Sequence, residues 1–220
     1  MNKQTFWTIV NMIKGHTIFS NQQKSVELQL SVTLFLLGRK FTIWDIASKF
    51  GISIGSVVKY TQRVIIAIQS LRSQYLLMEL TLTYMKHLAN HVQGVIDHLG
   101  QFINYDIGWP ASVYDAKVFS NSSLYIQQHI LFQSEDYVLT DSTYPISKNC
   151  ISSFKVLTGQ QRLFNKKYNK TRVVMEQVFC RLKNQFEFLK EVRNRNTKLA
   201  TKFIDIVLIL HNIVKRNNDI

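Results

Sequence analysis

The chain has 220 residues, of which 46% are hydrophobic, so it can form a packed core, and its composition excludes a wholly disordered protein. It carries 27 Lys and Arg against 14 Asp and Glu, a formal net charge of +13, and such an excess favours a polyanionic partner, most commonly nucleic acid. Only two cysteines occur, which excludes a disulfide framework and a cysteine-rich zinc site.

Targeting signals are not evident in the sequence. The first residues mix apolar and polar side chains, unlike a signal peptide. No window approaches the roughly 20 uncharged apolar residues that a membrane span needs. We therefore expect a protein that is neither secreted nor embedded in a membrane and that is located in the nucleus or the cytoplasm.

Residues 1–71 have the pattern of an all-helical region. In "SVELQLSVTLFLLG" the apolar residues recur at helical spacing, and Gly38 ends the run. In the segment that follows, Thr42 and Ser53 are candidate caps for two short helices, and Gly51 between them suits a tight turn.

These two short helices have the spacing of a helix-turn-helix. Small Ala47, the turn glycine and apolar Val57 stand at offsets 0, 4 and 10, which allows two helices to cross closely. An ordinary helical hairpin gives the same short pattern, but the basic composition favours DNA binding. The second helix would then present its DNA-contacting side chains, which are Ser53, Ser56, Lys59, Tyr60 and Arg63.

After residue 91 the pattern changes to strands followed by helices. The segments "HVQGVID", "QFINYDIG" and "DYVLTD" are each typical of a short strand. Two long amphipathic helices follow, "TRVVMEQVFCRLKNQFEFLKEV" and "TKLATKFIDIVLILHNIVKR". This part of the chain is therefore expected to form an α/β domain.

The segment between these two parts is less regular. "YLLMELTLTYM" alternates apolar and polar residues, which indicates a strand, whereas "KHLANH" has no clear period. We therefore expect a helical region over residues 1–71, an atypical junction over 72–91 and an α/β domain over 92–215.

Three acids stand where they could share a metal ion. Asp97 and Asp141 each follow a predicted strand, and Glu176 lies on the long helix. A helix packed on a sheet can bring a glutamate to acids at the strand ends, and two or three such oxygens hold Mg²⁺ or Mn²⁺. Metal ions held in this way activate a water for phosphodiester cleavage. The alternatives are solvated turns for the two aspartates and, for Glu176, an exposed ion pair with Arg172 one turn earlier.

Several segments resemble a known family. "VQGVIDHLGQFINYDIGWPASVYDAKVFSNSSLY", "YVLTDSTYP" and "FNKKYNKTRVVMEQVFCRLKNQFEFLK" resemble, in this order, the sequence blocks of PIF/Harbinger-type transposases. "LILHNIV" is similar to the closing helix of that family. The helical region ahead of these blocks is similar to the helix-turn-helix region that precedes the catalytic domain of the family.

The resemblance implies an RNase H-like mixed sheet with flanking helices, in which three acids bind divalent metal and cut DNA at transposon ends. Asp141 and Glu176 match the second and third of these acids. The family also implies a separate DNA-binding protein as a partner. The cations expected to contact DNA phosphates in this domain are Lys166, Lys167, Arg172 and Lys183.

The block that carries the first acid of the family, of the form G-x-I-D-G-T-H, has no counterpart upstream of "VQGVID". In RNase H-like sheets the strand with this acid is central, so we expect an incomplete sheet that lacks its middle strand. Two replacements remain open. Asp97 could take the place of the acid if its strand shifted register, or "MELTLTY" could supply a substitute strand with Glu79 as an off-register acid. A slip by one residue would reverse every side chain. A gene-model error across residues 72–91 is a further explanation.

The sequence thus predicts a transposase-derived, metal-dependent DNA endonuclease that is impaired by the missing acid. The alternative is a DNA-binding or interaction remnant of a transposase without nuclease activity. Convergence of Asp97, Asp141 and Glu176 in the structure would favour the nuclease. An Asp97 that points away, or a sheet without its central strand, would favour the remnant.

Overall fold

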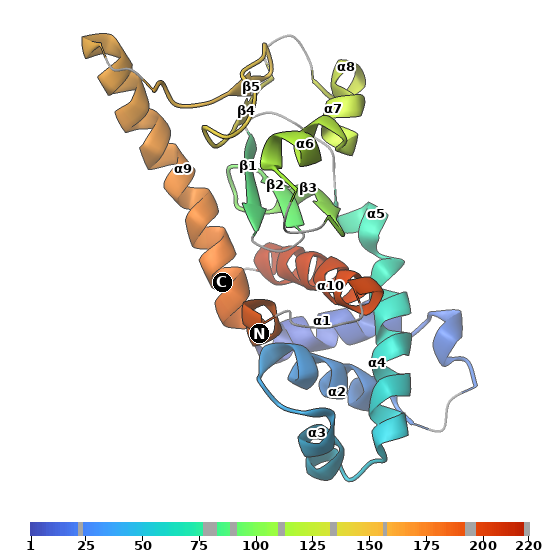
Figure 1. Cartoon of the computed structure of the whole chain (residues 1–220). Coiled ribbons are helices and arrows are strands. Elements are labelled where there is room, and N and C mark those ends of the chain that lie inside the picture. The colour runs from blue at the N-terminus through green and yellow to red at the C-terminus, as the bar shows by residue number, and fades with distance from the viewer. Residues whose placement is uncertain are drawn as a thin grey trace. The chain divides into compact units, whose positions relative to one another are not determined.

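Figure 1 shows the computed structural model of the chain. The residues that it describes are 1–21, 24–76, 83–88, 92–109, 113–132, 136–155, 158–191 and 197–217. They form two compact units: the first comprises Met1–Tyr75 and Leu182–Ile220, and the second comprises Leu76–Arg181. Among these residues, no helix combines the length and the hydrophobicity that crossing a bilayer requires.

The first unit is helical. Its central helix is α10, in which every residue from Phe203 to Val214 is buried. The sequence pattern placed this helix in the same domain as the strands, but it packs against α1 and α4 of the N-terminal region. The helices of this unit are α1 (Lys3–Ile13), the 3-10 helix η1 (Thr17–Phe19), α2 (Val26–Gly38), α3 (Ile43–Phe50), α4 (Ile54–Gln69), α5 (Arg72–Tyr75), the 3-10 helix η2 (Glu187–Glu191) and α10 (Thr197–Arg216).

The ends of α3 and α4 follow the predicted capping signals. Thr42 Oγ1 accepts a hydrogen bond from the backbone N–H of Asp45, whose carboxylate accepts one from the N–H of Thr42, so the two residues form a capping box. Hydrogen bonds from the hydroxyl and then the backbone of Thr42 lower the pKa of Asp45. Gly51 ends α3 with a φ of 62°, and Ser53 caps α4 through the N–H of Ser56. The two caps and the turn are therefore confirmed.

A small apolar core joins α2, α3 and α4. Ala47 and Val57, the small and apolar residues of the predicted crossing, pack together with Val32 and Ile46. Tyr60 belongs to the same core and is only 7% exposed. Tyr60 is therefore a core residue, which corrects its expected place on a DNA-contacting surface.

The second unit is built around a mixed five-stranded sheet in the order β3-β2-β1-β4-β5. Strand β2 runs antiparallel to both of its neighbours, β4 runs parallel to β1, and β5 runs parallel to β4. The strands are β1 (Thr83–Leu88), β2 (Val92–Ile96), β3 (Phe102–Ile107), β4 (Val138–Leu139) and β5 (Cys150–Ile151). Three of them lie in the segments expected to be strands after residue 91, and the short β5 was not predicted.

The middle of the sheet is occupied by β1. Tyr84 pairs with Ile96 of β2 on one side and with Leu139 of β4 on the other. The expectation that the sheet lacks its middle strand is therefore wrong. Strand β1 includes part of the segment without clear period, and central strands need no polar–apolar alternation because both faces of the sheet are covered. Residues 77–82, which include most of the alternating segment, lie outside the described residues.

One face of the sheet is covered by the long helix α9 (Gly159–Gln185). The rings of Phe102 and Phe179 meet edge to face with their centroids 5.5 Å apart. Gly94 lies beneath them, and a Cβ atom at this position would come within 3.0 Å of Phe102 and 3.2 Å of Phe179. The absence of a side chain on β2 thus allows α9 to approach the sheet closely.

The opposite face is covered by the short helices α6 (Asp115–Ser120) and α7 (Ser123–Ile126), which α8 (Gln128–Leu131) follows (Figure 1). These three short helices lie in the described part of residues 113–132. The apolar core on this side contains Val95, Ile103, Phe119, Leu124, Val138, Tyr144 and Cys150.

The positive φ of Gly51 can be tested by substitution. Gly51→Ala should lower the free energy of unfolding by about 1 kcal/mol because an L side chain is strained in the left-handed region. An added Cβ meets nothing within 4 Å at Gly51 or at Gly15, and only Gly51 has a positive φ. Gly15→Ala is therefore the matched control in urea denaturation, and an equal loss in both variants would contradict this explanation.

Candidate active site

Two of the three predicted acids meet on one cation. Arg172 Nη2 lies 3.1 Å from Asp141 Oδ2 and 3.3 Å from Glu176 Oε1. Because both oxygens contact the same nitrogen atom, the two carboxylates lie within reach of a single cation. All three side chains are partly exposed, with accessible fractions of 29% for Arg172, 31% for Asp141 and 46% for Glu176. The site is thus open to solvent and to a large substrate.

The elements that carry these residues explain why they meet. Asp141 follows β4 directly, and Arg172 and Glu176 lie one turn apart on α9. One turn before Arg172, the buried Tyr168 donates a hydrogen bond from its hydroxyl to the backbone carbonyl of Thr140. Residues at i, i+4 and i+8 share one face of a helix, so this bond fixes the same face of α9 that brings Glu176 to Asp141. Sequence reasoning missed Tyr168, although its spacing from Glu176 is a usable signal.

Burial raises the pKa of two side chains near Asp141, those of Tyr168 and Cys150. Burial raises the pKa of Tyr168 to about 12, an effect that Arg172 opposes and the carboxylate of Asp141 reinforces. The phenol therefore stays protonated and remains a hydrogen-bond donor at neutral pH. Burial likewise raises the pKa of the Cys150 thiol, which contacts Thr140 Oγ1 at 3.3 Å. A buried, protonated thiol is a core group and not a nucleophile.

The third predicted acid, Asp97, lies elsewhere. Asp97 Oδ1 accepts a hydrogen bond from the backbone N–H of Gln101 at 2.8 Å, within the turn that joins β2 to β3. The last residues of β2 and β4, Ile96 and Leu139, both pair with Tyr84, but the two strands flank β1 and run in opposite directions, so the chain continues away from Tyr84 in opposite directions toward Asp97 and toward Asp141. The structure therefore does not bring Asp97 to Asp141 and Glu176.

The central strand β1 supplies no acid that could serve as a third ligand in place of Asp97. In the β1–β4 register, Thr83 pairs with Val138 and Tyr84 with Leu139. The same offset, carried two residues further, brings Lys86 level with Asp141, and the whole strand reads "TYMKHL". Within the described residues, no three His, Cys, Asp or Glu side chains gather closely enough to hold a metal ion. Glu79, the other proposed replacement, lies outside the described part of the chain.

The two carboxylates of Asp141 and Glu176 therefore fit one hard divalent ion and not two. Mg²⁺ is commonly bound through one or two carboxylates together with waters and substrate phosphates, and Asp141 and Glu176 are two such carboxylates. A two-ion site needs more ligands than this pair supplies. In the structure the guanidinium of Arg172 takes the place between the carboxylates, so an ion would have to displace it.

The predicted DNA-contacting residues are spread over both units. Lys59 is exposed and Arg63 is half-buried on α4, and Ser53 and Ser56 hydrogen-bond to each other at 2.9 Å in the cap of that helix. Lys166 and Lys167 are exposed on α9 in the second unit, and the half-buried Lys183 belongs to the first. By sequence, the first unit contains 17 Lys and Arg against 6 Asp and Glu, and the second contains 10 against 8. The positive charge of the protein is thus concentrated in the helical unit.

Comparison with known protein families assigns the class. Residues 72–212 match the family described as DDE superfamily endonuclease. The match covers more than half of the chain, so the chain belongs to this family. It includes the central strand β1 as well as Asp141 and Glu176. No curated protein and no solved structure matches the chain.

The raised pKa of Tyr168 predicts a loss of stability at high pH. The ordinary pKa is 10.0 and the folded value is about 12, so between these values the unfolded chain loses the proton that the folded chain keeps. The free energy of unfolding should therefore fall as the pH rises from about 10 to about 12, and Tyr168→Phe should show a smaller fall. Urea denaturation across this range measures both curves. If the free energy of unfolding falls equally with pH in the parent and in Tyr168→Phe, Tyr168 is not the group whose pKa is raised by folding.

Proposed function

We propose that the chain is a transposase-derived DNA endonuclease of the PIF/Harbinger type, in which Asp141 and Glu176 hold one Mg²⁺ or Mn²⁺ ion at the cleavage site. The observation that carries this proposal is the meeting of both carboxylates on one nitrogen atom of Arg172. Membership of the endonuclease family supports DNA as the substrate. The proposal keeps the two acids that the resemblance indicates and leaves out Asp97, which lies in the turn after β2, on the other side of β1 from β4.

An RNase H-like fold is part of this proposal. Its support is the strand order β3-β2-β1-β4-β5 with β2 as the one strand that runs against the others. Helices on both faces of the sheet are also expected for that fold. The positions of Asp141 after β4 and of Glu176 on the helix that follows β5 support the proposal that they are the second and third acids of the resemblance.

The side chains of the site have separable roles. A bound divalent ion would polarise the scissile phosphate and lower the pKa of a coordinated water. Asp141 and Glu176 supply the carboxylate oxygens that bind the ion. Arg172, once released from the carboxylates, is placed to donate hydrogen bonds to phosphate oxygens, since guanidinium groups pair well with phosphate. Tyr168 holds α9 in register with β4 and so positions Glu176.

We further propose that α3 and α4 form a helix-turn-helix that binds DNA. The tight turn at Gly51 and the close packing of Ala47 and Val57 support this assignment. Lys59 and Arg63 lie one turn apart on α4, and neither has an ion-pair partner among the described residues. The excess of Lys and Arg in the helical unit raises its affinity for phosphate backbones. A nuclear location and a separate DNA-binding protein partner belong to the same proposal.

A second candidate function is DNA binding without cleavage. The observation that favours it is that Lys86, and no acid, comes level with Asp141 on the central strand. In that case the pair of carboxylates and Arg172 form a structural ion-pair network, and the chain is a remnant that keeps only its DNA-binding surface. The two functions differ in a single measurable property, which is phosphodiester cleavage.

Plasmid nicking separates the two candidates. In Mg²⁺ or Mn²⁺, the purified protein should convert supercoiled plasmid to the nicked form, and Asp141→Asn or Glu176→Gln should abolish nicking because each removes a carboxylate ligand. Asp97→Asn is the matched control and should retain nicking. Equal nicking by the parent and Asp141→Asn would contradict the proposal that Asp141 binds the metal ion needed for cleavage. Absence of nicking by a parent that still binds DNA would support the remnant.

DNA binding by α4 has its own test. Lys59→Ala and Arg63→Ala should each weaken binding to duplex DNA and reduce the slope of log Kd against log salt by about 1, as expected for the loss of one phosphate contact. Lys14→Ala, which removes an exposed cation at the C-cap of α1, should leave both properties unchanged. Fluorescence anisotropy at several salt concentrations measures the slopes. Equal effects from Lys14 and Lys59 would show that only net charge matters.

A further inference from the structure

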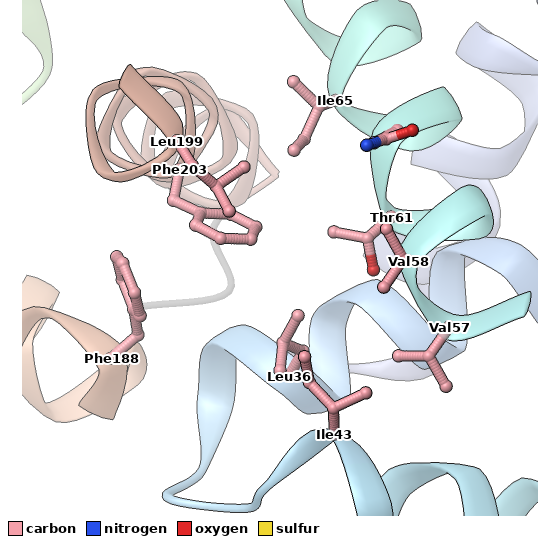
Figure 2. Close-up of a pocket in the computed structure, with 10 residues that line it drawn as sticks. Leu36, Ile43, Val57, Val58, Thr61, Ile65, Phe188, Leu199 and Phe203 are labelled. Carbon is pink, nitrogen blue, oxygen red and sulfur yellow. The ribbon is translucent and has the colours of Figure 1, made fainter. Parts of the chain in front are cut away.

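An apolar groove lies in the helical unit, bounded by α2, α3, α4, η2 and α10. Its volume is about 200 Å³, and its wall consists almost entirely of carbon atoms. Figure 2 shows Phe188, Leu199 and Phe203 on one side of the groove, facing α4 on the other. We call this feature the α4–α10 groove.

Part of the wall of the groove is exposed to solvent although it is apolar. Ile43 is 38% exposed and Val58 is 41% exposed, and Trp44, next to Ile43 in the chain, is 73% exposed. Contiguous apolar surface of this kind marks interaction sites in soluble proteins. A phosphate backbone gains nothing from such a surface, so the groove is not explained by DNA binding.

The rim of the groove is basic. Lys198 and Lys202 are exposed on α10, each directly before a wall residue, and Lys190 is exposed two residues after Phe188. None of the three lysines has an ion-pair partner in the described part of the chain. Glu187 and Glu191 are the acids of η2, so the three lysines outnumber the two acids among these residues. An occupant with carboxylates beside its apolar side chains complements both the wall and the rim.

We infer that the α4–α10 groove binds an amphipathic helix of a partner protein, with apolar side chains in the groove and acidic side chains against Lys198 and Lys202. This is the helix-in-groove mode, in which anchors at i, i+3, i+4 and i+7 enter an apolar cleft. At 3.6 residues per turn, Lys59 and Arg63 point roughly 150° away from the centre of the α4 residues that line the groove. The partner and DNA therefore bind to different sides of α4, and the interaction does not depend on nuclease activity.

The test uses a synthetic probe with the full chain. The probe is a fluorescein-labelled helical peptide of about 16 residues, with Leu and Phe at i, i+3, i+4 and i+7 and Glu at most other positions. We expect binding in the micromolar range by anisotropy, and at least about tenfold weaker binding of a scrambled peptide and of a peptide with Lys in place of Glu. Equal binding of the scrambled or the basic peptide would overturn the inference.

Matched variants locate the binding surface. Val58→Asp places a charge in the groove, whereas Ile66→Asp changes a side chain of the same helix that is 45% exposed and does not line the groove. Val58→Asp should weaken peptide binding by at least about tenfold, and Ile66→Asp by less than about twofold. Lys198→Glu with Lys202→Glu should also weaken binding, and Lys14→Glu should not. Circular dichroism verifies that each variant is folded. A Val58→Asp variant that is folded and binds as the parent does would contradict the inference.

Two other occupants are distinguished by the same variants. If Val58→Asp weakens duplex DNA binding as much as it weakens peptide binding, the groove is part of the DNA surface and the inference is wrong. If the parent dimerises at micromolar concentration in sedimentation experiments and Val58→Asp does not, the occupant is a second copy of the chain, and the inference is again wrong. A monomeric parent whose DNA affinity is unchanged by Val58→Asp supports the partner helix.

Discussion

The close approach of α9 to the sheet at Gly94 is the constraint on which the candidate site depends. A side-chain atom at that position would crowd the edge-to-face pair of Phe102 and Phe179, and interiors packed at this density transmit such a displacement to neighbouring residues. About three turns before Phe179, the hydroxyl of Tyr168 is bonded to the carbonyl of Thr140, which holds the other end of the contact. Between these two points α9 has no freedom to rotate, so Glu176 comes to rest beside Asp141.

Once the two carboxylates are close together, electrostatics requires a cation between them. Like charges in proximity repel each other, and a cation that contacts both offsets this repulsion. In the structure that cation is the guanidinium of Arg172, and in a nuclease it would be a divalent ion. The same geometry therefore serves an ion-pair network and a metal site. The family match shows that the chain belongs to the endonuclease family. Because the register brings a lysine, and no acid, level with Asp141 on β1, we propose one ion at this site and not two.

The features that sequence predicted correctly are those that depend on local chemistry. The caps at Thr42 and Ser53 and the turn at Gly51 need only their nearest neighbours, and the apolar stripe of α9 needs only helical spacing. The central strand β1 could not be predicted because its position comes from pairing with strands on both sides and not from alternation. Tyr60 was misplaced because its side of α4 lies between the polar surface and the core. The sequence indicated that Asp141 and Glu176 could meet, and the structure brings both carboxylates to Arg172, but Asp97 could not be separated from them until the strand directions were known.

The central claim is that Asp141 and Glu176 together hold one divalent ion in place of Arg172. Anomalous diffraction from crystals of the protein soaked in Mn²⁺ tests it most directly, because it locates the ion without relying on activity. We predict one anomalous peak within coordination distance, about 2 to 2.5 Å, of a carboxylate oxygen of each acid, with the guanidinium of Arg172 moved away. A peak at Asp97, or no peak and an unchanged contact from Arg172 to both carboxylates, would contradict it.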